Sequence, residues 1–350
     1  MKMANGAGDP DALFQREQTW TIGSAPMRSS MVVLFVLVLL PATAQTFDLE
    51  QFEQIFRPRL KVDTRWTPPA SFTDQEGTYE DRAVVGVFTV PVYQRWSAGI
   101  DLNAEGKGVV ERLKNSVRIR ASQVLANGRV GIRELRIGSD GDVRTLYTGS
   151  VGALGVSLTR NFRVLFWSAN VNVSEEESTV DQMVPRFNGV IGKLRINGAR
   201  KQLFYGLAVT LSDGLNLPIP FVGGTEPIGD RWSFQYVLPV QLAVGFKLSD
   251  DTRFQGGVGA DGFRSGFAQG DDRVNFNYTA LRAFVNVRHR LSRTVQLRAE
   301  IAGLPVRQIR LPDPAGDLQR YPINAGWSVQ GGINIFFGNS TLERILDTVL

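Results

Sequence analysis

The feature that most constrains the fold of this chain is a two-residue alternation of apolar and polar side chains, which recurs from residue 59 to residue 337. The longest example spans residues 232–248. One face of this segment carries Trp232, Phe234, Tyr236, Leu238, Val240, Leu242, Val244, Phe246 and Leu248, and the other carries Ser233, Gln235, Gln241, Gly245 and Lys247. Successive side chains of a strand point to opposite faces, so this period predicts strands with one apolar face. The chain is therefore expected to be all-β.

Segments with this pattern are long. They cover residues 59–66, 82–91, 95–102, 115–124, 129–138, 146–158, 162–173, 188–197, 202–211, 232–247, 252–262, 277–290, 294–304 and 326–337. Most reach the roughly 9–11 residues that a tilted strand needs to cross a bilayer, whereas strands of soluble sheets average about 5–6 residues. An exported soluble β-sandwich would show the same alternation and is the alternative fold, which solubility without detergent would reveal.

The connections between these segments are expected to alternate in length. Short turns are expected at residues 92–94, 125–128, 159–161, 198–201, 249–251 and 291–293, and long loops at 67–81, 103–114, 174–187, 212–231, 263–276 and 305–325. Short periplasmic turns opposite long external loops are typical of outer-membrane barrels. We therefore predict a transmembrane antiparallel up-and-down β-barrel of about 14 strands, or 12 if residues 59–66 form a plug and one other segment is not a strand. An even number of strands places both termini in the periplasm.

The N-terminal region has the pattern of an export signal. Residues 31–40 form a continuous apolar run, which is much shorter than the roughly 20 residues of a spanning helix. Ala42 and Ala44 follow it in small-x-small spacing, which predicts cleavage after Ala44 and, since Met27 opens a well-formed signal, a translation start at Met27. A longer leader that includes residues 1–26 is the alternative.

The predicted organisation follows from these boundaries. It comprises an N-terminal extension and signal peptide (1–44), a periplasmic N-terminal segment (45–58), an outer-membrane barrel (59–337) and a periplasmic C-terminal helix (338–350). Apolar residues at helical spacing predict a short helix in each terminal segment. The expected location is the cell outer membrane.

Two stretches resemble a known family. They are YGLAVTLSDGLNLPIPFVGG (205–224) and RWSFQYVLPVQLAVGFKLSDDTRFQGGVGADG (231–262). They are similar to bacterial outer-membrane β-barrels, and in particular to an uncharacterised barrel family common in Bacteroidetes-type bacteria. The resemblance implies the barrel fold and no activity. Typical barrels end on an aromatic strand, whereas here Phe336 and Phe337 are followed by thirteen further residues.

Charged residues on the polar faces of the strands are the candidates for lining the lumen. They are Lys114, Arg118, Arg120, Arg282, Arg288, Arg290, Arg298 and Glu300. An Arg that faced lipid at the bilayer midplane would cost roughly 2–4 kcal/mol, so these side chains are expected to point inward. They could form a positively biased passage for anionic solutes, or they could pair with lumenal carboxylates and close the interior.

Few residues are suited to catalysis. The chain has no Cys and one His, and His289 shares a face with apolar residues, so neither an enzyme nor a metal or cofactor site is expected. Gly257, Gly259 and Gly262 match a phosphate-binding spacing, but no helix pattern follows them. The net charge of +5 is spread along the chain and does not suggest a nucleic-acid partner.

We therefore expect a passive channel or small-solute transporter with a positively biased lumen. A structural or binding surface barrel with a closed lumen is the alternative, followed by a membrane-embedded lipid hydrolase. The expected partners are outer-membrane lipid and lipopolysaccharide, small solutes and the barrel-assembly machinery.

Overall fold

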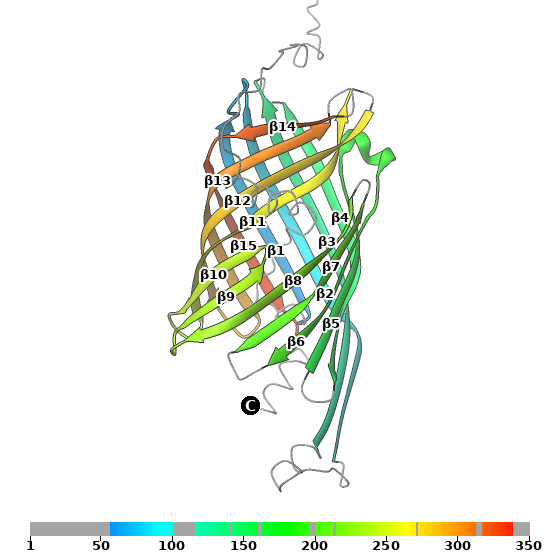
Figure 1. Cartoon of the computed structure of the whole chain (residues 1–350), viewed down its shortest axis with the longest axis vertical. Helices are drawn as coiled ribbons and strands as arrows, with labels where there is room; N and C mark the ends of the chain where they lie inside the picture. The colour runs from blue at the N-terminus through cyan, green and yellow to red at the C-terminus, as the bar shows by residue number, and fades with distance from the viewer. Residues whose placement is uncertain are drawn as a thin grey trace, which may run out of the picture.

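The computed structural model describes residues 57–100, 117–139, 142–159, 163–196, 201–212, 215–270, 272–312 and 317–338. These residues form one antiparallel sheet that closes into a barrel (Figure 1). The strands are β1 (Arg59–Ser71), β2 (Thr78–Ile100), β3 (Val117–Gly138), β4 (Val143–Thr159), β5 (Arg163–Glu176), β6 (Arg186–Ile196), β7 (Gln202–Ser212), β8 (Leu215–Ile228), β9 (Trp232–Leu238), β10 (Gln241–Lys247), β11 (Thr252–Gln269), β12 (Asp272–Arg290), β13 (Val295–Pro312), β14 (Leu318–Ile323) and β15 (Gly326–Phe336). A single turn of 3-10 helix, η3 (Glu177–Gln182), follows β5, and no helix in the described ranges is long and apolar enough to span a membrane.

The ring closes because each strand pairs with the next and β1 pairs with both β2 and β15. β14 and β15 both pair with β13 and are two parts of one strand, separated at Asn324 and Ala325. The barrel therefore has 14 strands, which confirms the predicted architecture. Both described ends lie at one rim, here called the terminal rim, where Arg57 Nε donates to the Gly338 carbonyl at 3.2 Å. The opposite end is called the far rim.

The strand count is right although several predicted boundaries are wrong. The turns predicted at 92–94 and 125–128 do not form, because β2 and β3 pair continuously from Thr78 to Ile100 with a bulge at Pro91. A bulge accommodates a proline that lacks the N–H needed for the ladder. The predicted loop 212–231 instead contains β8, and the predicted strand 232–247 is a hairpin of β9 and β10. Two pairs of predicted strands are thus one strand each in the structure, and two strands that were not predicted bring the count back to 14.

Most of the predicted long loops are extensions of the strands. The loop predicted at 263–276 is paired strand up to Gln269 and again from Asp272, and the loop predicted at 67–81 is reduced to residues 72–77. The expected alternation of short and long connections is therefore wrong for these loops. The long loop predicted at 103–114 was expected on the external side, but β2 ends at Ile100 and β3 begins at Val117 on the terminal side. The predicted signal peptide and both predicted terminal helices lie outside the described residues.

The outer surface is apolar along the strands. Large apolar side chains that are at least 36% exposed include Val130 and Ile132 on β3, Val285 on β12 and Ile301 on β13. The strand neighbours of Val285 and Ile301 are buried and those of Val130 and Ile132 are half-buried, so exposure alternates along each strand. An apolar exterior around a closed barrel is the arrangement of outer-membrane β-barrels, in which the outward band faces lipid.

Replacing Val285 with Arg tests this assignment. Val285 is 55% exposed on the outer face of β12, five residues before the end of the strand, and an Arg at a lipid-facing midplane position costs about 2–4 kcal/mol of unfolding free energy. The matched control is Leu291→Arg, which is 58% exposed in the connection after β12 and should cost about 0–1 kcal/mol. Urea unfolding in lipid vesicles measures both. Equal, small effects would contradict a lipid-facing exterior.

The interior is layered from one rim to the other. Near the far rim, aromatic and aliphatic side chains of β1–β4 and β11–β14 form a far-rim cluster, which includes Phe72, Tyr79, Leu135, Phe267, Phe276 and Tyr278. Toward the terminal rim, a second apolar cluster covers the inner wall of β3–β9 and includes Leu125, Leu154, Phe166 and Phe204. Polar side chains lie between the two clusters. This middle layer contains the candidate site.

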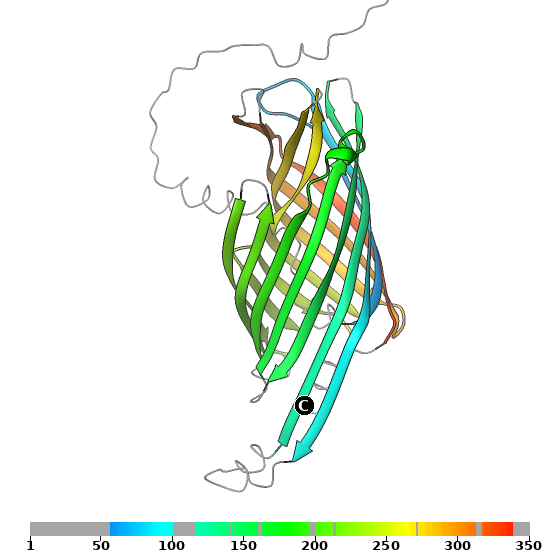
Figure 2. The same ribbon diagram turned by 90° about the vertical axis from the view of Figure 1, so that its right-hand side faces the viewer.

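The β9–β10 hairpin is shorter than its neighbours. Each of its strands has seven residues, whereas β8 has 14 and β11 has 18. Figure 1 shows this hairpin low in the barrel wall, beneath β11, whereas in Figure 2 the cyan and teal strands β2 and β3 extend well beyond the others. Above the hairpin, β11 reaches β5, where Gly266 pairs with Glu175.

Candidate functional site

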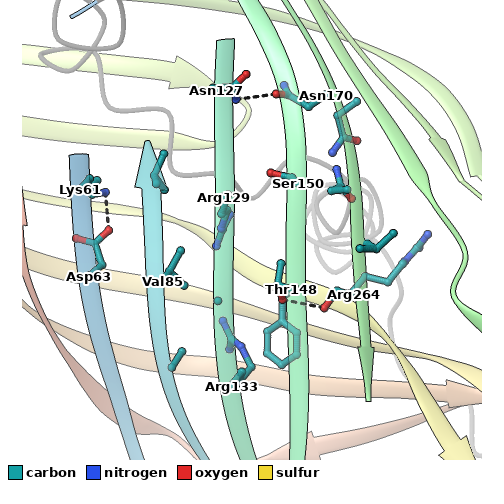
Figure 3. A pocket seen from close by; sticks show the side chains of 18 of the residues that line it. Lys61, Asp63, Val85, Asn127, Arg129, Arg133, Thr148, Ser150, Asn170 and Arg264 are labelled. Atoms are coloured by element: carbon teal, nitrogen blue, oxygen red, sulfur yellow. Dashed lines mark hydrogen bonds and ion pairs between the residues drawn. The ribbon is translucent and has the colours of Figure 1, made fainter. Parts of the chain in front are cut away.

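A cavity of about 450 Å³ occupies the middle layer of the barrel. Its wall comes mainly from β1–β6 on one side and from residues 261–264 of β11 on the other. Its charged lining residues are seven cations, Arg59, Lys61, Arg65, Arg129, Arg133, Arg186 and Arg264, and two carboxylates, Asp63 and Asp261. The described wall is therefore strongly electropositive, and Figure 3 shows several of these side chains together.

Three of the cations form a cluster on neighbouring strands. Thr89 of β2 pairs with Arg59 of β1, and Val87 of β2 pairs with Lys61. On its other side Val87 pairs with Arg129 of β3. Pairing across β2 thus brings the three cations to one part of the wall, here called the Arg59–Lys61–Arg129 cluster.

Only one member of this cluster has an ion-pair partner among the described residues. Lys61 Nζ lies 2.6 Å from Asp63 Oδ2. Within the described ranges, Arg59 and Arg129 have no carboxylate within 4 Å, and the buried Nε of each makes no hydrogen bond to protein. A buried cation without a partner is costly, so these two guanidinium groups favour an anion in the cavity.

Three other cations of the cavity form an ion pair or a hydrogen bond with another strand. Arg65 Nη1 lies 2.5 Å from Asp261 Oδ2, and Arg133 Nη1 lies 2.6 Å from Asp81 Oδ2. Arg186 Nη1 donates to the Arg264 carbonyl at 2.7 Å. These contacts link β1 and β6 to β11, and β3 to β2.

Neutral polar groups complete the lining near the cluster. Asn127 Nδ2 donates to Asn170 Oδ1 at 2.8 Å, so these two amides are held across β4 (Figure 3). Ser150 and Asn172 line the same region. Hydroxyl and amide donors beside guanidinium groups are suited to binding carboxylate, sulfonate or phosphate oxygens.

The residues predicted to line the lumen occupy other places. Arg282, Arg288, Arg298 and Glu300 are buried on the inward faces of β12 and β13, and none of them lines the cavity. Glu300 accepts from Arg282 Nη1 at 2.5 Å through Oε1 and from Arg298 Nη2 at 2.7 Å through Oε2. Arg288 Nη2 donates to Gln255 Oε1 at 3.0 Å. These groups form an ion-pair network against the wall.

The remaining members of that predicted set are not placed in the interior. Arg290 is exposed at the end of β12 near the terminal rim. Arg118 and Arg120 lie on β3 without described side chains, and Lys114 lies outside the described residues. Their role in a lumen stays a prediction.

Several cavity residues that were not predicted can still be recognised in the sequence as inward-facing. Lys61, Asp63 and Arg65 alternate with outward apolar residues, and so do Arg129 and Arg133. Their inward parity can therefore be read from the sequence. Their shared height in the barrel depends on strand pairing.

No group of three or more His, Asp or Glu side chains is placed to hold a metal ion within the described ranges. His289 is exposed, and its Nδ1 lies 2.9 Å from the Thr252 hydroxyl at the terminal rim.

Comparisons with known proteins add only a general likeness. No family model matches the chain, and no curated protein matches it. The resemblance to a Bacteroidetes-type barrel family therefore stays a prediction.

Several solved outer-membrane barrels are similar in fold. The outer membrane protein Omp33 of Acinetobacter baumannii is 10% identical over 81% of this chain and 99% of its own, with a TM-score of 0.32. The transport unit of the autotransporter AIDA-I from Escherichia coli is 8% identical over 88% and 98%, with a TM-score of 0.33. The toluene transporter TodX of P. putida is 8% identical over 81% and 90%, with a TM-score of 0.25. These values are too low to transfer any residue role or activity.

Proposed function

We propose that this protein is a passive outer-membrane transporter that admits small anionic solutes to the electropositive cavity. The observation that carries this proposal is the charge of the lining, where seven Arg and Lys side chains face two carboxylates. Arg59 and Arg129 supply the binding groups, because neither forms an ion pair within 4 Å among the described residues, and Asp63, which attracts both, is paired with Lys61. Rings of Arg and Lys favour anions in other pores.

The far-rim cluster restricts the route that a solute could take through such a transporter. Phe276 and Tyr79 are fully buried in it, so packed rings lie across the direct route from the cavity to the far rim. The proposal is therefore a solute-binding transporter whose far end is closed to solutes but passes small ions such as chloride, and not a wide, open pore. In this view the terminal rim is periplasmic, as the sequence predicts.

Replacing Arg129 with Gln tests the proposal. The full chain is reconstituted in planar bilayers, and the reversal potential is recorded in a potassium chloride gradient. We expect anion preference in the original protein and an anion-to-cation permeability ratio at least about threefold lower in Arg129→Gln, since a hydrogen bond to a charged group contributes about 1.5–3 kcal/mol. Arg290→Gln removes the same charge from an exposed position and should leave the ratio unchanged.

Cation preference in the original protein, or an equal ratio in both variants, would overturn the proposal. A folded barrel that never conducts would favour the second candidate function, a structural or binding barrel with a closed lumen. The specific observation behind that candidate is the ion-pair network around Glu300, which fills part of the interior together with the far-rim cluster.

A further inference from the structure

The barrel wall is interrupted above the β9–β10 hairpin. β8 pairs with β9 only from Val222 onward, and β11 pairs with β10 only up to Gly259. Among the described residues, 215–221 of β8 and 260–265 of β11 have no strand partner on the sides that face each other. Three other hydrogen bonds reach this part of β11. The Ala260 N–H donates to the Val240 carbonyl at 2.9 Å, the Gly262 N–H donates to Asp261 Oδ1 at 2.8 Å, and Arg186 Nη1 donates to the Arg264 carbonyl at 2.7 Å. We call this interruption the lateral gap.

Contacts of β5 with β11 and β12 close the gap toward the far rim. Ser174 Oγ lies 3.1 Å from Ser265 Oγ, and Arg273 Nη2 lies 2.7 Å from Glu175 Oε1. The turn of the β9–β10 hairpin closes it toward the terminal rim. The gap is thus a bounded interruption in a wall that is otherwise continuous.

The edge of β8 at the gap is adapted to having no partner. Pro218 and Pro220 both lie in the section that pairs only with β7. Proline lacks an N–H and is confined to strand edges, so this edge has fewer donors to leave unsatisfied. Open sheet edges are costly in lipid and are tolerated where they border a protein-lined or water-filled cavity.

The two sides of the gap differ in polarity. On the outside, Leu238, Val258 and Leu281 are exposed at this height, so the gap opens between lipid-facing side chains. On the inside, its lower margin consists of apolar residues of the second cluster, among them Phe221 and Val240. At its upper margin, Asp261 and Arg264 of β11 also line the cavity, so the gap adjoins the cavity there.

We propose that the lateral gap is a passage through which an amphipathic anion moves between the bilayer and the cavity. The ligand has one anionic headgroup, which Arg59 and Arg129 bind, and an apolar tail, which lies against the apolar inner wall near Phe221 and Val240. The closed far rim makes a side entrance the direct route from the outside. This inference rests on the proposed function, because it places the headgroup in the same cavity.

The test uses the absence of Cys from the chain. Val240→Cys places one thiol at the lower margin of the gap, and Val151→Cys places a matched thiol on the lipid-facing side of β4, where Val151 is 66% exposed. Both proteins are reconstituted as full chains in vesicles, checked for folding by heat-modifiable gel migration, and reacted with the lipid-soluble reagent N-cyclohexylmaleimide. Binding of 11-(dansylamino)undecanoate is then followed by stopped-flow dansyl emission, with the probe preloaded in the bilayer.

We expect both thiols to react, and the blocked Val240→Cys protein to bind the probe at least about fivefold more slowly than the blocked Val151→Cys protein. If only the Val240→Cys protein failed to react, the gap would be closed to lipid and the inference would be overturned. Equal binding rates would show entry from water through a rim, which also overturns the lateral route but leaves the proposed function intact.

Two further outcomes distinguish a failure of the proposed ligand class from a failure of the proposed transport function. If the probe does not bind while Arg129 still controls anion selectivity, the amphipathic ligand is wrong and the proposed function stands. If neither probe binding nor Arg129-dependent selectivity is seen, both proposals fail.

Discussion

Replacing Glu300 with Gln is expected to lower the free energy of unfolding by about 3–5 kcal/mol. Glu300 is the shared partner of two buried guanidinium groups, Arg282 at 2.5 Å and Arg298 at 2.7 Å. Gln preserves the shape of the side chain but removes its charge, so both cations lose their counter-ion in the barrel interior. Breaking a buried ion pair from one side has this cost because the remaining charge is left uncompensated.

Urea unfolding in lipid vesicles, followed by tryptophan fluorescence, measures the effect. The control is Glu226→Gln, because Glu226 pairs with Lys201 at 2.8 Å and both side chains are more than a third exposed. Exposed pairs contribute about 0–1 kcal/mol. The double variant Glu300→Gln with Arg298→Gln should recover part of the loss, since one uncompensated charge is gone. A loss below about 1 kcal/mol for Glu300→Gln, the range of an exposed pair, would mean that water in the lumen solvates the two cations.

Replacing Phe276 with Ala is expected to open the far end of the barrel. Phe276 is fully buried, and its ring centroid lies 5.1 Å from that of Phe267 and 5.5 Å from that of Phe263. Arg133 and Arg144 cover the outer rings, at 3.7 Å from the Phe263 centroid and 4.3 Å from the Phe267 centroid. Removing the central ring should cost about 3–5 kcal/mol of unfolding free energy and leave a space across the blocked route.

Single-channel conductance and liposome swelling with small sugars measure the opening, and both should rise. Phe204→Ala is the matched control, because Phe204 is also fully buried but belongs to the second apolar cluster on the wall of β3–β9. It should cost similar stability without raising permeation. Equal permeation in the two variants would show that the far-rim cluster is not what closes the lumen.

The stacked pair of Tyr79 and Tyr278 makes the same cluster depend on distant parts of the chain. Their ring centroids are 5.1 Å apart, although one belongs to β2 and the other to β12. Neither residue stands out in the sequence, because Tyr79 lies in the predicted loop 67–81 and Tyr278 at the start of the predicted strand 277–290. Their role at the far rim appears only when the barrel closes.

The sequence by itself determined the class of fold, the antiparallel barrel and its apolar exterior. Alternation is a local property, because the direction of a side chain in a strand depends only on its parity along the chain. The inward direction of Arg282, Arg298 and Glu300 and the outward direction of Val285 could therefore be predicted without any knowledge of pairing. The predicted count of about 14 strands was also right, but through errors that cancelled.

The errors arose where local signals are weak or misleading. The proline at 91 and the Asn127–Gly128 dipeptide are typical of turns, yet both lie inside the long pairing of β2 with β3. Conversely, β8 contains Pro218, Pro220 and a Gly pair and was predicted as loop, although it pairs with β7 from Leu215 onward. Here the hydrogen bonds and side-chain contacts of neighbouring strands outweigh the preferences of single residues.

Only the tertiary structure decided which inward residues share a site. Arg65 and Asp261 are far apart in the sequence but form a 2.5 Å ion pair, and two strand pairings align Lys61 with Arg129. The height of a residue in the barrel depends on the register of every intervening strand, and the lateral gap depends on the short β9–β10 hairpin between two longer strands. Parity is read from one strand, whereas register and ring closure are properties of all the strands together, and this is why the sequence predicted a barrel but not its cavity.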